Sequence, residues 1–221
     1  MSLRVPAVVL ELLVGCWIVF GVVAIANGFA HESVLHRIAQ DPERITFAEV
    51  GIDQHRADAI NGISLGLLVL TGIAFVVWFQ RAYRNLDALG IRRRYGTGWA
   101  IGGWFVPFLN LARPKQIADD IWASVVLSKR GDTGVRGESE LLVFWWTAWL
   151  GSTILGLFAG PRDTTNQTVG SALAHNGFFI AHTAVTMIAA VLVFFVVRAI
   201  TRAQTVLVVE ARTSFRAVRA R

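Results

Sequence analysis

The chain has 221 residues, of which 54% are hydrophobic and only 16% are charged. Soluble domains carry about 25% charged residues, so this composition argues against an ordinary soluble enzyme, and the hydrophobicity excludes a disordered chain. The formal net charge is +6 at pH 7. In a polar protein that charge would indicate nucleic acid. In so apolar a chain, basic residues are expected along the inner membrane face, and we expect no nucleic-acid partner.

Four stretches are apolar over the roughly 20 residues that a membrane-spanning helix needs. They are residues 5–27, 60–80, 141–161 and 171–197. Glu11, inside the first apolar run, disfavours a cleaved signal peptide, so we expect an uncleaved span there. The sequence therefore predicts an all-α protein of the cell membrane, with residues 1–221 forming one integral domain of four transmembrane helices.

A fifth uncharged stretch, residues 95–112, contains four glycines, Pro107 and Asn110. Proline removes a backbone donor, and backbone groups freed in a membrane must be satisfied within protein or a wet cavity. We therefore predict a re-entrant or interfacial segment on the cytoplasmic side, not a continuous span. Three residues at the inner end of the second span are placed to bond its carbonyls or lipid phosphates: Arg81, Arg84 and Asn85.

The distribution of lysine and arginine favours four spans over five, with the N- and C-termini both cytoplasmic. With four spans, 17 basic residues lie inside and 4 outside, whereas five spans give 14 and 7. Seven tryptophans then fall near the inner face, which is typical of an anchoring belt at the membrane interface. They are Trp78, Trp99, Trp104, Trp122, Trp145, Trp146 and Trp149.

Two segments outside the spans show helical signals. In the acidic outer loop, residues 31–59, Thr46 and Glu49 have the spacing of a capping box, so we expect a helix to begin there. After Pro114 apolar residues recur at helical spacing, and Asp119 and Asp120 fall on the polar side of the predicted helix. That pattern predicts an amphipathic helix lying flat in the inner interface, with both aspartates solvated.

Ionisable groups inside a membrane are costly and are therefore candidates for function. For Glu11 the alternatives are a structural pair with an arginine, such as Arg81 or Arg198, and an ion or proton role. His182, near the middle of the fourth span, is most simply a hydrogen-bonded interior residue. We find no metal-ligand spacing, cofactor motif or catalytic signature in the sequence.

Small residues spaced by four predict where helices approach closely. One such pair, Gly62 and Gly66, lies in the second span, and another, Gly156 and Gly160, lies in the third. The spacing supports a compact bundle of helices and does not identify an oligomer.

The densest run of distinctive residues lies between Trp78 and Ser124. Its distinctive positions are Trp78, Arg81, Ala82, Asn85, Gly98, Trp99, Trp104, Pro107, Asn110, Leu111, Pro114, Ile117, Trp122 and Ser124. At these positions, and over roughly residues 60–204, the chain resembles the bacterial multi-pass membrane family known as domain of unknown function 4328. The resemblance implies a multi-pass membrane protein of unassigned function and supplies no catalytic residues.

Three functions remain open. The first is a non-enzymatic membrane protein that acts at the cytoplasmic face through anionic lipids, a membrane-protein partner or a second copy of itself. The second is a small transporter or channel that uses the broken segment 95–112, and the third is a membrane-embedded enzyme. The candidate motif residues are Trp78, Arg81, Asn85, Trp99, Trp104, Pro107, Asn110 and Pro114, and the intramembrane ionisable candidates are Glu11 and His182.

Overall fold

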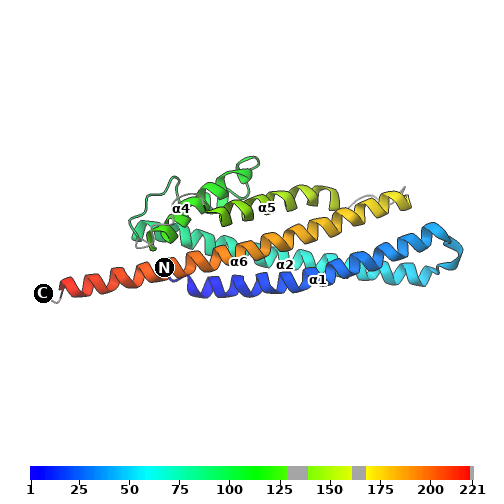
Figure 1. Ribbon diagram of the computed structural model, residues 1–221, viewed down its shortest axis with the longest axis horizontal. Helices are drawn as coiled ribbons and strands as arrows, with labels where there is room; N and C mark the ends of the chain where they lie inside the picture. The colour runs from blue at the N-terminus through cyan, green and yellow to red at the C-terminus, as the bar shows by residue number, and fades with distance from the viewer. Residues whose placement is uncertain (129–138, 161–167, 220–221) are drawn as a thin grey trace. The chain divides into compact units, whose positions relative to one another are not determined.

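The computed structural model describes residues 1–128, 139–160 and 168–219, with side chains described through residue 211. Within these ranges the chain is helical and contains no strand, as the sequence predicts (Figure 1). The elements in chain order are α1 (Arg4–Gln40), the 3-10 turn η1 (Pro42–Arg44), α2 (Phe47–Ala88), α3 (Trp99–Gly102), the 3-10 turn η2 (Leu109–Leu111), α4 (Arg113–Ser128), α5 (Glu140–Ala159) and α6 (Val169–Arg219).

Four of these helices are long and apolar enough to cross a membrane, namely α1, α2, α5 and α6. The four predicted spans are therefore confirmed, although the last residue expected in the third span, Pro161, lies outside the described residues. The protein is an all-α membrane protein.

The helices on both sides of the acidic segment extend beyond the apolar runs. The loop between them is therefore shorter than the predicted outer loop 31–59, and that prediction is wrong in length. α1 continues to Gln40 and α2 begins at Phe47. The capping box is confirmed, because the Thr46 amide donates to the Glu49 carboxylate at 3.0 Å and the Glu49 amide donates to the Thr46 hydroxyl at 3.2 Å. Satisfied amides at its first turn let α2 begin well before the apolar stretch.

The chain divides into two compact units. The first, which we name the motif unit, comprises residues 1–13, 71–146 and 192–221. The second, which we name the acidic unit, comprises residues 14–70 and 147–191. The motif unit contains α3, η2 and α4 and nearly all of the distinctive residues that the sequence singles out.

The core of the motif unit contains a cluster of aromatic rings, which come from α2, α5 and the segment after α3. Neighbouring ring centroids lie 5.3 to 6.4 Å apart, mostly in tilted or edge-to-face geometry. The expectation of an interfacial belt is wrong for Trp78, Trp145 and Trp146, because these three side chains are buried inside the protein. The cluster consists of Phe75, Trp78, Phe79, Trp104, Trp145 and Trp146.

The segment from residue 95 to residue 112 is broken, as the glycines and Pro107 predict. It contains the single helical turn α3, a series of turns and η2. Phe108 has a positive φ of 63°, which is uncommon for a residue with a side chain. Phe105 and Phe108 are 74% and 85% exposed. The broken segment therefore exposes aromatic side chains on the surface of the protein.

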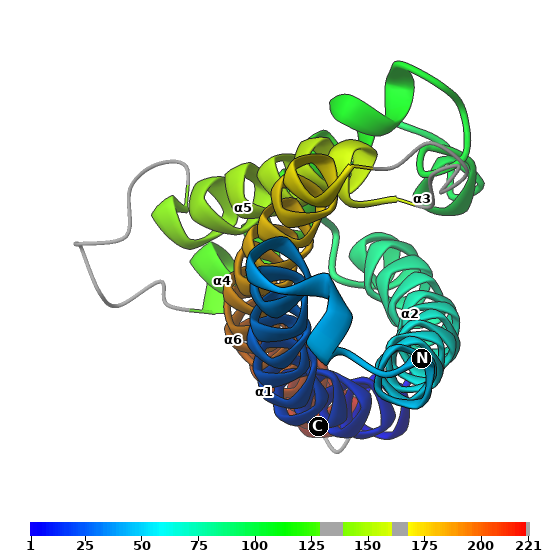
Figure 2. The ribbon, with the colours of Figure 1, turned by 90° about the vertical axis from the view of Figure 1, so that its right-hand side faces the viewer.

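In the acidic unit, α1 and α6 run side by side (Figure 1 and Figure 2). Asn176 donates to the main-chain oxygen of Gly28 at 3.0 Å, and a Cβ atom at Gly28 would lie 2.7 Å from Ile180. The glycine prediction is wrong for Gly62 and Gly66, around which a Cβ atom would meet nothing within 4 Å. Close approaches fall instead on α1 and, as the spacing predicts, on Gly156 of α5, where a Cβ atom would lie 3.2 Å from the His182 ring.

Candidate functional site

A buried pair of side-chain amides joins α2 to α6 in the motif unit. The amide nitrogen of Asn85 donates to the side-chain oxygen of Gln204 at 3.0 Å. Gln204 in turn donates to the main-chain oxygen of Ala82 at 3.1 Å and reaches the Ser124 hydroxyl on α4 at 3.5 Å. Buried amides need such partners because they have lost water. The network fixes three helices against one another.

Asn85 has a further partner, at the start of the chain. Its amide nitrogen donates to the main-chain oxygen of Met1 at 3.0 Å, and its side-chain oxygen accepts from the Met1 amino group at 2.7 Å. The expectation that Asn85 would bond the carbonyls of the broken segment is therefore wrong. Arg81 and Arg84 are exposed and have no hydrogen-bond or ion-pair partner among the described residues.

Asp120 forms a second buried centre, on α4. One of its oxygens accepts from the main-chain amide of Arg94 at 2.9 Å and from the Tyr83 hydroxyl at 3.3 Å. The other lies 3.0 Å from the Arg94 side-chain Nε atom. The prediction that Asp120 is solvated is wrong. α4 buries part of its polar side as well as its apolar side, and Asp120 lies in the buried part. Its neighbour Asp119 is partly exposed and pairs with Lys115 at 2.5 Å.

The first half of the broken segment contacts α4 through a hydrogen bond and cation–π interactions. The Tyr95 hydroxyl donates to the Gln116 side-chain oxygen at 2.7 Å. The Arg113 guanidinium lies 4.0 Å from the centroid of the Tyr95 ring and 4.7 Å from that of Trp99. Gly103 permits this packing, because a Cβ atom there would lie 2.8 Å from the main-chain oxygen of Trp99.

The other candidate motif residues lie in the same unit and differ in their contacts. The Trp78 indole donates to the Thr201 hydroxyl on α6 at 3.1 Å, and Trp104 packs in the aromatic cluster. The main-chain amide of Asn110 donates to Val106 at 3.0 Å. Pro107 is exposed at the break. Pro114 is buried in the first turn of α4, where a proline sacrifices no helical hydrogen bond.

The two intramembrane candidates lie in different units. Glu11, in the motif unit, has a carboxylate oxygen 4.0 Å from the Arg198 Nε atom. His182, in the acidic unit, has its Nδ1 atom 2.8 Å from the main-chain oxygen of Ser152. Across the described residues, no group of three or more His, Cys, Asp or Glu side chains is arranged to hold a metal ion.

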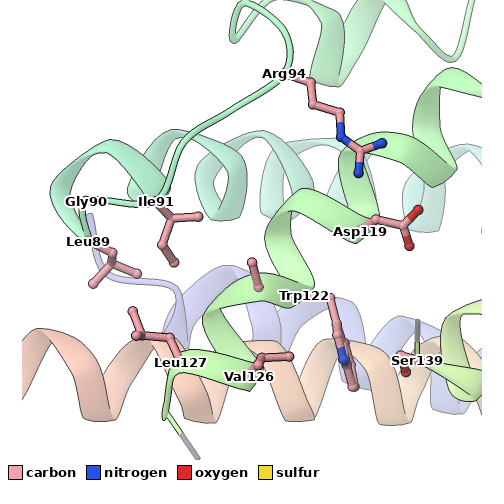
Figure 3. Close-up of a pocket in the computed structure, with 10 residues that line it drawn as sticks. Leu89, Gly90, Ile91, Arg94, Asp119, Trp122, Val126, Leu127 and Ser139 are labelled. Carbon is pink, nitrogen blue, oxygen red and sulfur yellow. The ribbon is translucent and has the colours of Figure 1, made fainter. Parts of the chain in front are cut away.

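A pocket that sequence reasoning missed lies between α4 and the chain that follows α2 (Figure 3). Its volume is about 630 Å³. Helical periodicity after Pro114 puts Trp122 and Val126 on the apolar side of α4, but no local signal brings the residues after α2 against them. The lining residues are Leu89, Gly90, Ile91, Arg94, Asp119, Trp122, Ala123, Val126, Leu127 and Ser139.

Charge is distributed unequally between the two units. Among the side chains that the structure describes, the motif unit has ten lysines and arginines against six acids. The acidic unit has three arginines against six acids. The positive charge of the chain is thus concentrated in the unit that holds the distinctive residues.

A family model described as a domain of unknown function, DUF4328, matches residues 41–202. The match covers well over half of the chain and begins earlier than the resemblance at residues 60–204 indicated. It starts next to η1, so it takes in the whole of α2. No curated protein and no solved structure matches the chain.

Proposed function

This chain belongs to the DUF4328 family, and we propose that it is a non-enzymatic integral protein of the cell membrane that binds anionic lipids at the cytoplasmic face through its motif unit. In this proposal both termini are cytoplasmic. The proposal concerns lipid headgroups at the membrane surface and assigns no chemical reaction to the protein.

The unequal charge of the two units carries the proposal. Lysine and arginine are enriched on the cytoplasmic side of membrane proteins, so the motif unit is the one expected there. Each basic residue near an anionic leaflet contributes about 1 kcal/mol of attraction. Four helix-borne arginines are exposed and have no partner among the described residues: Arg4, Arg81, Arg84 and Arg202.

The exposed apolar side chains of the broken segment support the same function. Phe105, Phe108 and Leu111 are all exposed, and they belong to the same unit as the four arginines. Aromatic and aliphatic side chains next to basic ones are the combination that interfacial segments use to bind a membrane surface. We therefore favour an interfacial position for this segment over a re-entrant one.

The contacts of the two ionisable candidates give less support to a transporter. Glu11 has Arg198 as an ion-pair partner, and His182 has a main-chain oxygen as its partner. Neither residue lines the pocket described above. A permeation pathway would use such groups as free ligands for its substrate.

The test is lipid retention by the full-length protein. The wild type and a variant with Arg4, Arg81, Arg84 and Arg202 all changed to Gln are purified in mild detergent from mixed phosphatidylglycerol and phosphatidylcholine vesicles. We expect the wild type to retain phosphatidylglycerol preferentially, and the variant to lose about tenfold or more of that preference at low salt. The control variant changes two exposed arginines of the acidic unit, Arg37→Gln and Arg44→Gln, and should retain the preference for phosphatidylglycerol.

Two results would overturn the proposal. One is equal retention of the two lipids by the wild type. The other is an unchanged preference in the fourfold variant, and recovery of one stoichiometric protein partner from the same membranes would then favour the partner function instead.

A further inference from the structure

We propose that the pocket between α4 and the chain after α2 binds one molecule of a zwitterionic aminophospholipid, with phosphatidylethanolamine as the representative. This inference goes beyond the proposed function, because it names a second lipid class, which is zwitterionic, and a separate site for it. The phosphate would bind Arg94, the ammonium would bind Asp119, and an acyl chain would occupy the apolar part of the pocket.

The size and lining of the pocket suit an amphiphile. Ligand sites generally measure about 300–1,000 Å³ and combine apolar walls with a few polar groups, and this pocket measures about 630 Å³. In Figure 3, Leu89, Ile91 and Leu127 gather at one end, whereas Arg94 and Asp119 lie at the other. The pocket is therefore apolar at one end and charged at the other.

Arg94 is held in position to bind a phosphate. Its Nε atom pairs with the buried carboxylate of Asp120 at 3.0 Å, and its own main-chain amide bonds the same carboxylate. The two terminal guanidinium nitrogens have no partner among the described residues, and the side chain is 56% exposed. A guanidinium fixed at Nε presents the remaining N–H groups as a fork for phosphate oxygens.

The balance of charge around the pocket selects a zwitterion over an anion. Arg94 and Lys115 are opposed by Asp119 and Asp120, so these four side chains sum to no net charge. The Asp119 Oδ1 atom already pairs with Lys115, and a purely anionic headgroup would offer no donor to the other oxygen of this carboxylate. Phosphatidylethanolamine carries a phosphate and, beside it, an ammonium with three N–H donors that Asp119 can accept. Phosphatidylcholine has the same charges but no N–H donor.

Native mass spectrometry of the full-length protein tests the site. The detergent-solubilised protein is titrated separately with phosphatidylethanolamine, phosphatidylcholine, phosphatidylglycerol and inorganic phosphate. We expect one phosphatidylethanolamine per chain, bound about tenfold more tightly than the other two lipids, as the gain of one charge-assisted hydrogen bond predicts. Inorganic phosphate, which lacks the acyl chain, does not displace it.

Two variants and their controls assign the binding to this pocket. Ala123→Phe fills the pocket without removing a hydrogen bond, and Arg94→Gln removes the phosphate fork. Each should weaken phosphatidylethanolamine binding about tenfold or more. Ala112→Phe and Arg92→Gln place the same changes at exposed positions outside the pocket and leave binding unchanged. Because Arg94→Gln also affects Asp120, Ala123→Phe decides the matter if Arg94→Gln fails to fold.

The outcomes separate this site from the proposed function. Equal binding of all three lipids, full displacement by inorganic phosphate, or unchanged binding in Ala123→Phe overturns the site. Loss of phosphatidylglycerol preference in the fourfold arginine variant, with phosphatidylethanolamine binding intact, supports two separate lipid contacts. If the wild type shows no phosphatidylglycerol preference but Ala123→Phe loses phosphatidylethanolamine, the anionic-lipid function fails and the pocket remains.

Discussion

The side-chain nitrogen of Asn85 lies 3.0 Å from the side-chain oxygen of Gln204, although 119 residues separate the two in sequence. Both side chains are buried, at 4% and 1% exposure. Each therefore depends on the other for a hydrogen bond that water cannot supply. The contact joins the C-terminal end of α2 to α6.

We expect Asn85→Leu and Gln204→Leu each to destabilise the protein by about 1–2 kcal/mol, because each leaves the other buried amide with an unsatisfied group. The double variant should cost less than the sum of the two single changes. Unfolding in mixed detergent, measured for all four proteins, gives the coupling. Thr205→Val is the control, since that hydroxyl bonds only within its own helix. Strict additivity would show that the two amides act independently.

Two neighbouring aspartates on α4 should respond differently to the same change. Asp120→Asn removes the charge from a buried carboxylate with three partners, so we expect the free energy of unfolding to fall by about 1–3 kcal/mol. The loss is smaller than for a fully buried ion pair because the Arg94 side chain is half exposed. Asp119→Asn affects only the i,i+4 pair with Lys115 and should cost under about 0.5 kcal/mol. Thermal unfolding in detergent compares them, and equal losses would contradict the buried network.

Glycines of α1 and α2 should differ in the sign of their response to alanine. Gly28→Ala places a Cβ atom against Ile180, so we expect destabilisation of about 1–3 kcal/mol. Gly66→Ala meets nothing and gains helix propensity, so it should be neutral or stabilise the protein by up to about 1 kcal/mol. Thermal unfolding of the two variants tests this. The reverse order would show that α2, and not α1, forms the close helix contact.

The proposed orientation predicts a labelling pattern. In a Cys16→Ala background, which removes the single cysteine, Arg84→Cys and Asp58→Cys each introduce one exposed thiol. With cytoplasmic termini, a membrane-impermeant maleimide added to intact cells should label Asp58→Cys and should label Arg84→Cys only after permeabilisation. Labelling of Arg84→Cys in intact cells would reverse the orientation and remove the basis for a cytoplasmic lipid contact.

The sequence predicts the parts of the fold that depend on local properties. Apolar length alone identifies the four spans, and the spacing of Thr46 and Glu49 identifies the start of α2. Pro107 and the surrounding glycines identify the break, because proline and glycine act on their own stretch of backbone.

The candidate site depended on contacts that no local pattern contains. Periodicity treats Asp119 and Asp120 alike, yet only Asp120 meets Tyr83 and Arg94, which come from earlier in the chain. The partner of Asn85 lies more than a hundred residues away. Glycine spacing likewise marks which positions are small and does not indicate which face of a helix meets a neighbour.

The stability of the turn at Phe108 depends on the medium that surrounds the exposed side chain. A side chain at positive φ costs about 1–2 kcal/mol, and a glycine would avoid that cost. A phenylalanine that enters hydrocarbon gains about 1.5–3 kcal/mol, which is comparable or larger. Phe108 is 85% exposed, so the surroundings of the molecule, and not its own core, would have to supply that gain. We therefore expect this turn to hold its shape in a bilayer and to relax in water, so that lipid acts as a folding partner of residues 105–111.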